Sequence, residues 1–375
     1  MSASATLIST SSTPAEINYK ETSKGPAATR LVQPLKSSGA LDAHAHFSVT
    51  PVIGEEFEDL QVSQILHDDD KIRDLAIMVS ERGVVFLRNQ DITLEDQKAL
   101  AQKLGDLTGK PKTSKLHRHA FNASRRGITD DPNDKVDPEV FVICSKEGYK
   151  YYDDRFRYKC KAIASEGWHS DMTYEQVPPD YSLLKIHTIP NGNSGGDTLW
   201  ASGYEAYDRM SPPWKVFAES LTGVHAQPNF SEIAKRFDGN MLEGNRGSPL
   251  NTRTDFAASH PVIRTNPVTG WKSLFGAAHQ LEGGYFEGMT KEENHILKAY
   301  FLKLIAENHD LQVRLKWNVN DLAIWDNRCV FHSATNDVSG NATSTSMKKG
   351  NRAVSLGEKP FFDPVSKSRQ EALAL

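Results

Sequence analysis

The 375-residue sequence has few cysteines, no long apolar run and no excess of positive charge. Its three cysteines, Cys144, Cys160 and Cys329, are unpatterned, which argues against a disulfide framework and favours a reducing compartment. No apolar run approaches the roughly 18 residues of a membrane helix, so we expect no membrane partner. The net charge is -4. Without a strongly basic face, the chain is not expected to bind nucleic acid.

Residues 1–45 lack hydrophobic periodicity and are rich in Ser, Thr and Ala. They contain no apolar segment typical of a secretion signal, and Glu16 and Glu21 are atypical of a transit peptide. The C-terminal Leu-Ala-Leu matches no peroxisomal signal. We therefore predict a flexible N-terminal arm over residues 1–45, a single domain over residues 46–375 and a cytoplasmic location. Homo-oligomerisation is left open.

The remaining sequence combines short strands with a few helices. Helical spacing covers residues 70–83, and residues 93–105 open with a Thr93–Asp96 capping box. Residues 83–90 form an apolar, β-branched run typical of a buried strand. After residue 140, short strand patterns are interrupted by helical patterns at 212–221 and at 290–308, the second of which opens with a Thr290–Glu293 capping box. This order predicts a mostly β fold with flanking helices, such as a jelly roll.

The segment GWHSDMTYE, residues 167–175, places a histidine and a carboxylate two residues apart. In a strand, His169 and Asp171 would lie on the same face and could supply half of a metal site. His332 follows the strand pattern DLAIWDNRCVF and is placed to line a site just past the strand's rim. His187 is interpreted as a core residue. Five other histidines lie in polar stretches and are expected to be exposed: His44, His46, His67, His117 and His119.

Two histidines and one carboxylate form the facial triad of non-haem Fe(II) oxygenases, which leaves coordination positions open. Around these residues, the motifs WHSDMTYEQVPP, GGDTLWASGYEAYDRMS, NDLAIWDNRCVFHSAT and RAVSLGEKPFF occur in this order. The sequence from about residue 50 to 363 resembles the taurine/2,4-dichlorophenoxyacetate family of Fe(II)/2-oxoglutarate dioxygenases. The resemblance implies a double-stranded β-helix (cupin-like) core and O2 as a substrate. It also implies that His169, Asp171 and His332 bind Fe(II), and that Thr198 binds a carboxylate of 2-oxoglutarate.

The family pattern has two arginines, four residues apart, near the C-terminal end. The second corresponds to Arg352, but the first corresponds to Lys348, which cannot form a planar bidentate pair with a carboxylate. The resemblance implies that Lys348 anchors 2-oxoglutarate and Arg352 the substrate, although a shifted register would give the cosubstrate to Arg352. Ser165 stands where the taurine enzymes have an asparagine, and Phe230 is a candidate to line the substrate cavity.

The expected function is therefore the oxidation of a C–H bond in a small anionic substrate. Candidates are a sulfonate such as taurine, with release of sulfite, or an amino acid or other carboxylate of specialised metabolism. Two alternatives remain open on sequence grounds, a zinc hydrolase with the same three ligands and a catalytically inactive binding protein.

Overall fold

The computed structural model describes residues 34–120, 137–144, 163–189, 195–230, 242, 244–335 and 348–375. Its largest sheet has seven strands and is antiparallel except where β2 and β3 run parallel. In spatial order the strands are β1 (His46–Ser48), β2 (Glu55–Phe57), β3 (Val84–Leu87), β13 (Leu322–Asp326), β5 (Pro179–Thr188), β15 (Lys349–Leu356) and β4 (Val140–Cys144).

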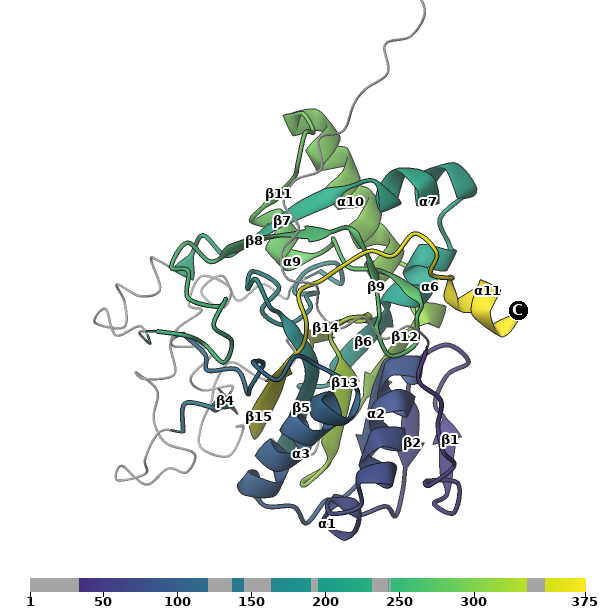
Figure 1. Cartoon of the computed structure of the whole chain (residues 1–375), viewed down its shortest axis with the longest axis vertical. Coiled ribbons are helices and arrows are strands. Elements are labelled where there is room, and N and C mark those ends of the chain that lie inside the picture. The colour runs from purple at the N-terminus through teal and green to yellow at the C-terminus, as the bar shows by residue number, and fades with distance from the viewer. Residues whose placement is uncertain are drawn as a thin grey trace, which may run out of the picture.

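Two amphipathic helices cover the outer face of this sheet (Figure 1). Helix α2 (Asp69–Arg82) ends at Gly83, whose φ of 76° is unfavourable for other residues. Helix α3 (Leu94–Leu107) begins with the predicted capping box, in which Thr93 accepts from the Asp96 backbone and Asp96 accepts from the Thr93 backbone. Their apolar faces and the sheet share one buried cluster. The predicted helix–strand–helix order is confirmed.

A three-stranded sheet packs against the inner face of the large sheet. Its spatial order is β12 (Gln312–Leu315), β6 (Thr198–Ser202) and β14 (Val330–Ala334). The buried side chains of Phe86 and Trp325, from the large sheet, meet Trp200 from the small one, with ring centroids 5.4 and 5.8 Å from that of Trp200. A tight turn connects β13 to β14, so the chain passes directly from one sheet to the other. The space between these sheets is where the candidate site lies.

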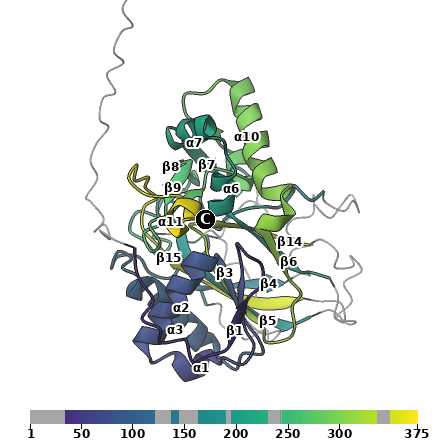
Figure 2. The same cartoon turned by 90° about the vertical axis from the view of Figure 1, so that its right-hand side faces the viewer.

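Most of the other elements form a third layer, above the two sheets in Figures 1 and 2, whereas the short helix α1 (Val62–Ile65) lies at the lower end of both views. Helix α10 (Lys291–Ala306), which has the predicted N-cap at Thr290, buries Leu297 and Phe301 in this layer. The further strands are β7 (Thr222–Ala226), β8 (Ala257–Pro261), β9 (Ile263–Thr265), β10 (Lys272–Leu274) and β11 (Tyr285–Phe286). The further helices are α1 (Val62–Ile65), α6 (Gly203–Asp208), α7 (Pro212–Glu219), α9 (His279–Glu282), the 3-10 helix His309–Leu311 and α11 (Arg369–Leu373). A mostly β fold with flanking helices is thus present.

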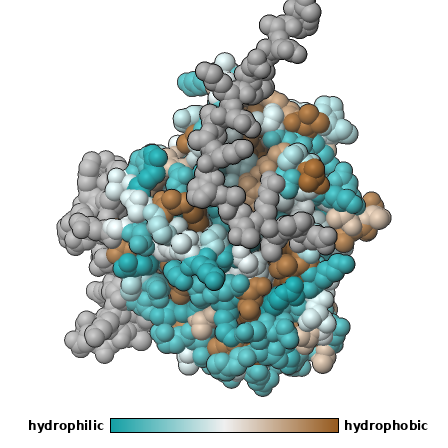
Figure 3. Space-filling view, in the orientation of Figure 1, coloured by the Kyte–Doolittle hydropathy of each residue, from teal (hydrophilic) through white to brown (hydrophobic). Residues whose placement is uncertain are grey.

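Hydrophilic side chains cover most of the lower part of the face in Figure 3, where α1, α2 and α3 lie. Within the described residues, no helix has both the length and the apolar character needed to cross a membrane.

The prediction of an arm over residues 1–45 is wrong for its last part. Residues 1–33 lie outside the described residues, but residues 34–45 pack on the domain, and Leu41 is only 2% exposed. The carboxylate of Asp74, in α2, accepts hydrogen bonds of 2.9 Å from the Ser37 and Ser38 hydroxyls and the Ala40 backbone N–H. These contacts join residues more than 30 positions apart, and a composition rich in small polar residues does not reveal them.

We expect Asp74→Ala to lower the free energy of unfolding by about 2 kcal/mol, because the Ser37 and Ser38 hydroxyls and the Ala40 backbone N–H lose the buried carboxylate that they share. Burial raises the pKa of Asp74, but the hydrogen bonds from Ser38 and Ser37 outweigh it and the pKa is lowered. The stabilisation should therefore be present above about pH 4 and disappear as the pH falls further. Urea unfolding at several pH values measures this, with Asp70→Ala on the exposed side of the same helix as the control. Equal stabilities of the two variants at pH 7 would contradict the assignment.

Candidate active site

His169, Asp171 and His332 converge between the two sheets. One ligand atom from each lies within 4.8 Å of the others. The backbones of His169 and His332 form a β-bridge, with N–H to O distances of 3.0 and 2.8 Å in the two directions. The bridge brings their rings to a centroid separation of 4.1 Å. The Nε2 of His332 lies 3.9 Å from Oδ1 of Asp171.

The local structures differ from two sequence-based expectations. Residues 167–175 do not form a strand, because only His169 makes a bridge and a turn begins at Asp171, followed by Met172 with a φ of 40°. His332 lies in the middle of β14 rather than past the rim of a strand. The bridge and the turn nevertheless place the predicted imidazole and carboxylate side by side.

The protonation states of these residues suit a metal cation. Burial lowers the pKa of both imidazoles, that of His332 to well below its usual value, so both rings are neutral. Burial raises the pKa of Asp171, but Arg352 and the two imidazoles lower it to about 2, so the carboxylate is ionised. Nδ1 of His169 lies 2.8 Å from the Gly167 carbonyl, which fixes Nδ1 as the donor and leaves Nε2 as a ligand atom. Neutral imidazoles and an ionised carboxylate are the forms that bind divalent metals.

Three groups hold Asp171 in place. Ser182 Oγ donates to Oδ2 at 2.7 Å, and Arg352 Nη1 donates to Oδ1 at 2.5 Å. The side chain of Asn327, in the turn between β13 and β14, accepts from the Asp171 backbone N–H at 3.2 Å and donates to Ser182 Oγ at 2.8 Å. The turn between the sheets thus orients the carboxylate through Ser182.

Ser182→Ala should weaken metal binding roughly 10- to 100-fold, because it removes a hydrogen bond that orients a ligand. The control is Ser170→Ala, a buried serine beside the same site whose hydroxyl donates to the Val330 carbonyl instead. Calorimetric titration with Mn(II) measures both variants. Similar metal affinities for the two would show that Ser182 does not position Asp171.

Thr198 and Lys348 lie on either side of Trp317. The indole Nε1 of Trp317 donates to Thr198 Oγ1 at 3.0 Å. The ammonium of Lys348 lies 4.9 Å from the centroid of the Trp317 ring and donates to the Gly196 carbonyl. Lys348 is only 7% exposed, so its side chain is buried beside Trp317. The structure brings together the two residues that the sequence assigned to 2-oxoglutarate.

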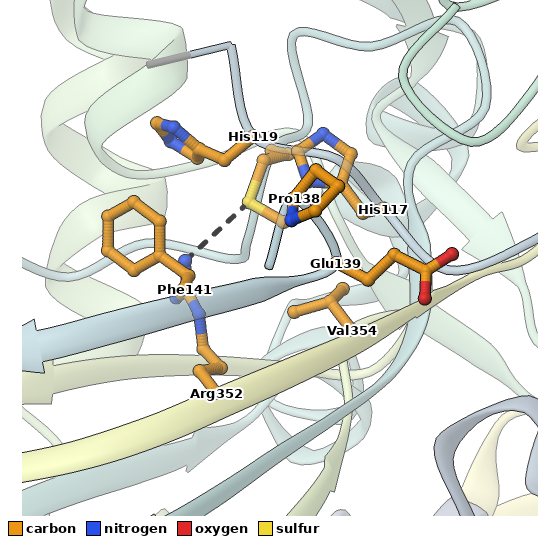
Figure 4. A pocket seen from close by; sticks show the side chains of 8 residues that line it. His117, His119, Pro138, Glu139, Phe141, Arg352 and Val354 are labelled. Atoms are coloured by element: carbon orange, nitrogen blue, oxygen red, sulfur yellow. Dashed lines mark hydrogen bonds between the residues drawn. The ribbon is translucent and has the colours of Figure 1, made fainter. Parts of the chain in front are cut away.

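Arg352, in β15 and four residues after Lys348, lines a pocket (Figure 4). Its guanidinium carbon is 4.9 Å from the centroid of the Phe141 ring. The other lining residues are His117, His119, Pro138, Glu139, Met172 and Val354. The pocket, directly beside Asp171, therefore combines one guanidinium, two imidazoles, the carboxylate-bearing side chain of Glu139 and an apolar wall.

The expectation that His117 and His119 are exposed is wrong. They are 4% and 7% exposed, and both line the pocket. The His117 backbone N–H donates to the Val354 carbonyl at 2.8 Å, so this segment pairs with β15 next to Arg352. Their i, i+2 spacing was the available signal, because alternate residues of an extended chain share a face. The basic residues around these two histidines instead indicated an exposed stretch.

Phe230 and Ser165 differ in their relation to the pocket. Phe230 is buried, and its ring lies 6.1 Å from that of His119, which itself lines the pocket, so Phe230 forms a second layer. Ser165 is half-buried in the turn before His169 and is not among the described residues that line the pocket. A role of Ser165 in substrate binding stays a prediction.

Residues 45–348 match the taurine catabolism dioxygenase TauD, TfdA family, and this chain belongs to that family. It is 46% identical, over 360 residues, to an alpha-ketoglutarate-dependent dioxygenase, btcD, of Neocamarosporium betae, a match that covers 91% of this chain and 99% of that protein. It is 30% identical to an alpha-ketoglutarate-dependent sulfonate dioxygenase of Saccharomyces cerevisiae, over 77% of this chain and 62% of the yeast protein.

Solved structures support the fold. A putative alpha-ketoglutarate-dependent taurine dioxygenase from Burkholderia xenovorans superposes with a TM-score of 0.62 at 23% identity, covering 86% of this chain and 93% of the bacterial one. The protein is therefore an oxidoreductase, a dioxygenase that depends on Fe(II), 2-oxoglutarate (alpha-ketoglutarate) and O2. The family and the names of its relatives do not support the zinc hydrolase or the inactive binding protein.

Proposed function

We propose that this dioxygenase oxidises a C–H bond of a small substrate with an anionic group and an apolar body, with His169, Asp171 and His332 as the Fe(II) ligands. The observation that carries the proposal is the position of Arg352, which lines the pocket and also contacts Asp171. A guanidinium so close to the metal ligands can hold an anion with its carbon chain beside the reacting centre.

The bound iron, 2-oxoglutarate and O2 supply the oxidant, and the protein residues position the reactants. Lys348 and Thr198 hold the distal carboxylate of 2-oxoglutarate, and Trp317 contacts both of these residues. Arg352 holds the anionic group of the substrate, while Phe141, Met172 and Val354 exclude water from the reacting carbon. Lys348, which directly precedes β15, and Arg352 on that strand are four residues apart, so both side chains can face the core that holds the triad.

A rigid ion pair supports the wall of the pocket. Both carboxylate oxygens of Glu175 accept from Arg246, at 2.5 and 2.8 Å, and His117 Nε2 lies 3.5 Å from the same carboxylate. Burial raises the pKa of Glu175, but Arg246 and His117 lower it below its ordinary value. The carboxylate remains ionised and orients the imidazole of His117, which lines the pocket.

The fold that supports this site is proposed to be a double-stranded β-helix, formed by the seven-stranded sheet and the sheet β12–β6–β14. The passage of β13 into β14 across the core supports this assignment. We also propose that the described residues form one domain, which begins no later than residue 34.

The anionic group is proposed to be a sulfonate, as in the substrate named for the yeast relative. Hydroxylation of the carbon that carries the sulfonate would then release sulfite and leave an aldehyde. A carboxylate is the second candidate, because the relatives at 39–46% identity are not named for sulfonates. Both groups fit a guanidinium, which forms bidentate hydrogen bonds with planar or tetrahedral oxyanions.

The test is a panel of compounds with the same carbon skeleton and a sulfonate, a carboxylate or a neutral amide at one end. With Fe(II), ascorbate and O2, succinate formation should depend on the charged end, and sulfite should appear only with the sulfonate. Equal turnover of the neutral compound would contradict the role of Arg352. A preference for the carboxylate compound would support an anion-binding pocket but would replace the sulfonate by a carboxylate as the proposed substrate group.

A further inference from the structure

Trp317 contacts both residues that are assigned to the cosubstrate. It is only 4% exposed and lies two residues after β12, whose Leu315 is paired with Thr198 of β6. This pairing places the indole N–H 3.0 Å from the Thr198 hydroxyl and the ring face under the Lys348 ammonium. One side chain therefore touches Thr198 and Lys348, which come from strands far apart in the sequence.

The indole N–H sets the direction of the Thr198 hydroxyl. An indole nitrogen can only donate, whereas a hydroxyl has one donor and two acceptor positions. Because Thr198 Oγ1 accepts from Trp317, its own proton is available for another acceptor. In this site the acceptor would be a carboxylate oxygen of 2-oxoglutarate, for which a donor with a fixed direction is favourable.

The ring face restricts Lys348 in a different way. A lysine ammonium is a mobile point charge on a flexible chain, whereas an arginine presents a rigid planar fork. A cation above an aromatic ring is attracted to the ring, most strongly to that of tryptophan. Together with the Gly196 carbonyl, the Trp317 ring limits the positions that the Lys348 ammonium adopts.

We propose that Trp317 is a positioning residue for 2-oxoglutarate, which orients the Thr198 hydroxyl and holds the Lys348 ammonium. It supplies, through a second side chain, the rigidity that an arginine at position 348 would have by itself. This inference rests on the proposed function, because it requires Thr198 and Lys348 to bind the cosubstrate.

The experiment measures the Kd of 2-oxoglutarate by calorimetry, with Mn(II) bound to the full-length protein under anaerobic conditions. Trp317→Phe keeps a ring but removes the N–H that orients the Thr198 hydroxyl. We expect the Kd to rise about tenfold, which is the effect of losing about one hydrogen bond between Thr198 and the 2-oxoglutarate carboxylate. Trp317→Leu also removes the ring and should raise the Kd further, while the affinity for Mn(II) stays unchanged. Trp271→Phe is the control, because Trp271 is buried in the same core cluster and packs on Tyr204.

A rescue separates positioning from a general effect on packing. Lys348→Arg should restore the part of the affinity that Trp317→Leu loses beyond Trp317→Phe, because the guanidinium fork needs no ring to orient it. If Trp317→Leu does not fold, Trp317→Met, which also lacks a ring, provides the same comparison with and without Lys348→Arg. A Kd within twofold of the wild type in Trp317→Phe, or a loss that Lys348→Arg leaves unchanged, overturns the proposal. Absence of 2-oxoglutarate binding by the wild-type protein would instead overturn the proposed function.

Discussion

His332→Ala is expected to abolish succinate formation and to lower the amount of bound metal at the same time. The substitution leaves one imidazole and one carboxylate, which cannot hold Fe(II) on the face that the reaction needs. Because His332 is in the middle of β14 and its backbone pairs with both β6 and His169, the strand itself should persist. Loss of metal with an unchanged circular dichroism spectrum is therefore the predicted result.

The matched control is His187→Ala. His187 lies on β5, half-buried in the large sheet and outside the cluster of ligand atoms. Metal content is measured after dialysis, and turnover is measured as succinate released per protein. Near-normal turnover of His332→Ala would show that the triad has been assigned wrongly, whatever happens to the control.

Lys348→Ala and Arg352→Ala are expected to affect different reactants. Removal of a buried charge partner costs roughly 2–5 kcal/mol in binding of the ligand that it held, or about 30-fold to a few thousand-fold in affinity. Lys348 lies beside Thr198 and Trp317, so its loss should raise the KM for 2-oxoglutarate. Arg352 lines the pocket, so its loss should raise the KM mainly for the prime substrate.

Lys349→Ala provides the control for this pair. Lys349 is the next residue on β15, where alternate side chains point to opposite faces, so its removal should change neither KM. A different result is also informative. If Lys348→Ala changes neither KM and Arg352→Ala abolishes 2-oxoglutarate binding, then Arg352 anchors the cosubstrate, and the argument for an anionic substrate fails.

The sequence predicted elements whose signals are local. The capping boxes of α3 and α10 each lie within four residues, and the structure contains both. The three clustered residues were also predictable, because the motifs around His169 and His332 carry the family pattern. No single spacing in the sequence shows that the backbones of these two histidines pair with each other.

The features that the sequence did not predict depend on contacts between distant residues. His117 appeared to lie in a basic exposed stretch, but its backbone pairs with Val354, more than 200 positions later. Residues 37–40 appeared to belong to a flexible arm, but they bind to Asp74. In both cases a polar local sequence packs on the rest of the protein because a partner elsewhere in the chain satisfies its hydrogen bonds.

The ion pair between Arg352 and Asp171 has a consequence for the order in which ligands bind. The guanidinium donates to Oδ1 of Asp171, the carboxylate oxygen that lies 3.9 Å from His332 Nε2 and faces the metal position. We expect a divalent cation to weaken the contact of Arg352 with this oxygen, because both are positively charged, and so to make the guanidinium available to an anion in the pocket. Since such coupling is reciprocal, the metal and the anionic substrate should each bind more tightly in the presence of the other. Calorimetric titration of the substrate into metal-free and Mn(II)-loaded protein would measure this coupling, and equal affinities would rule it out.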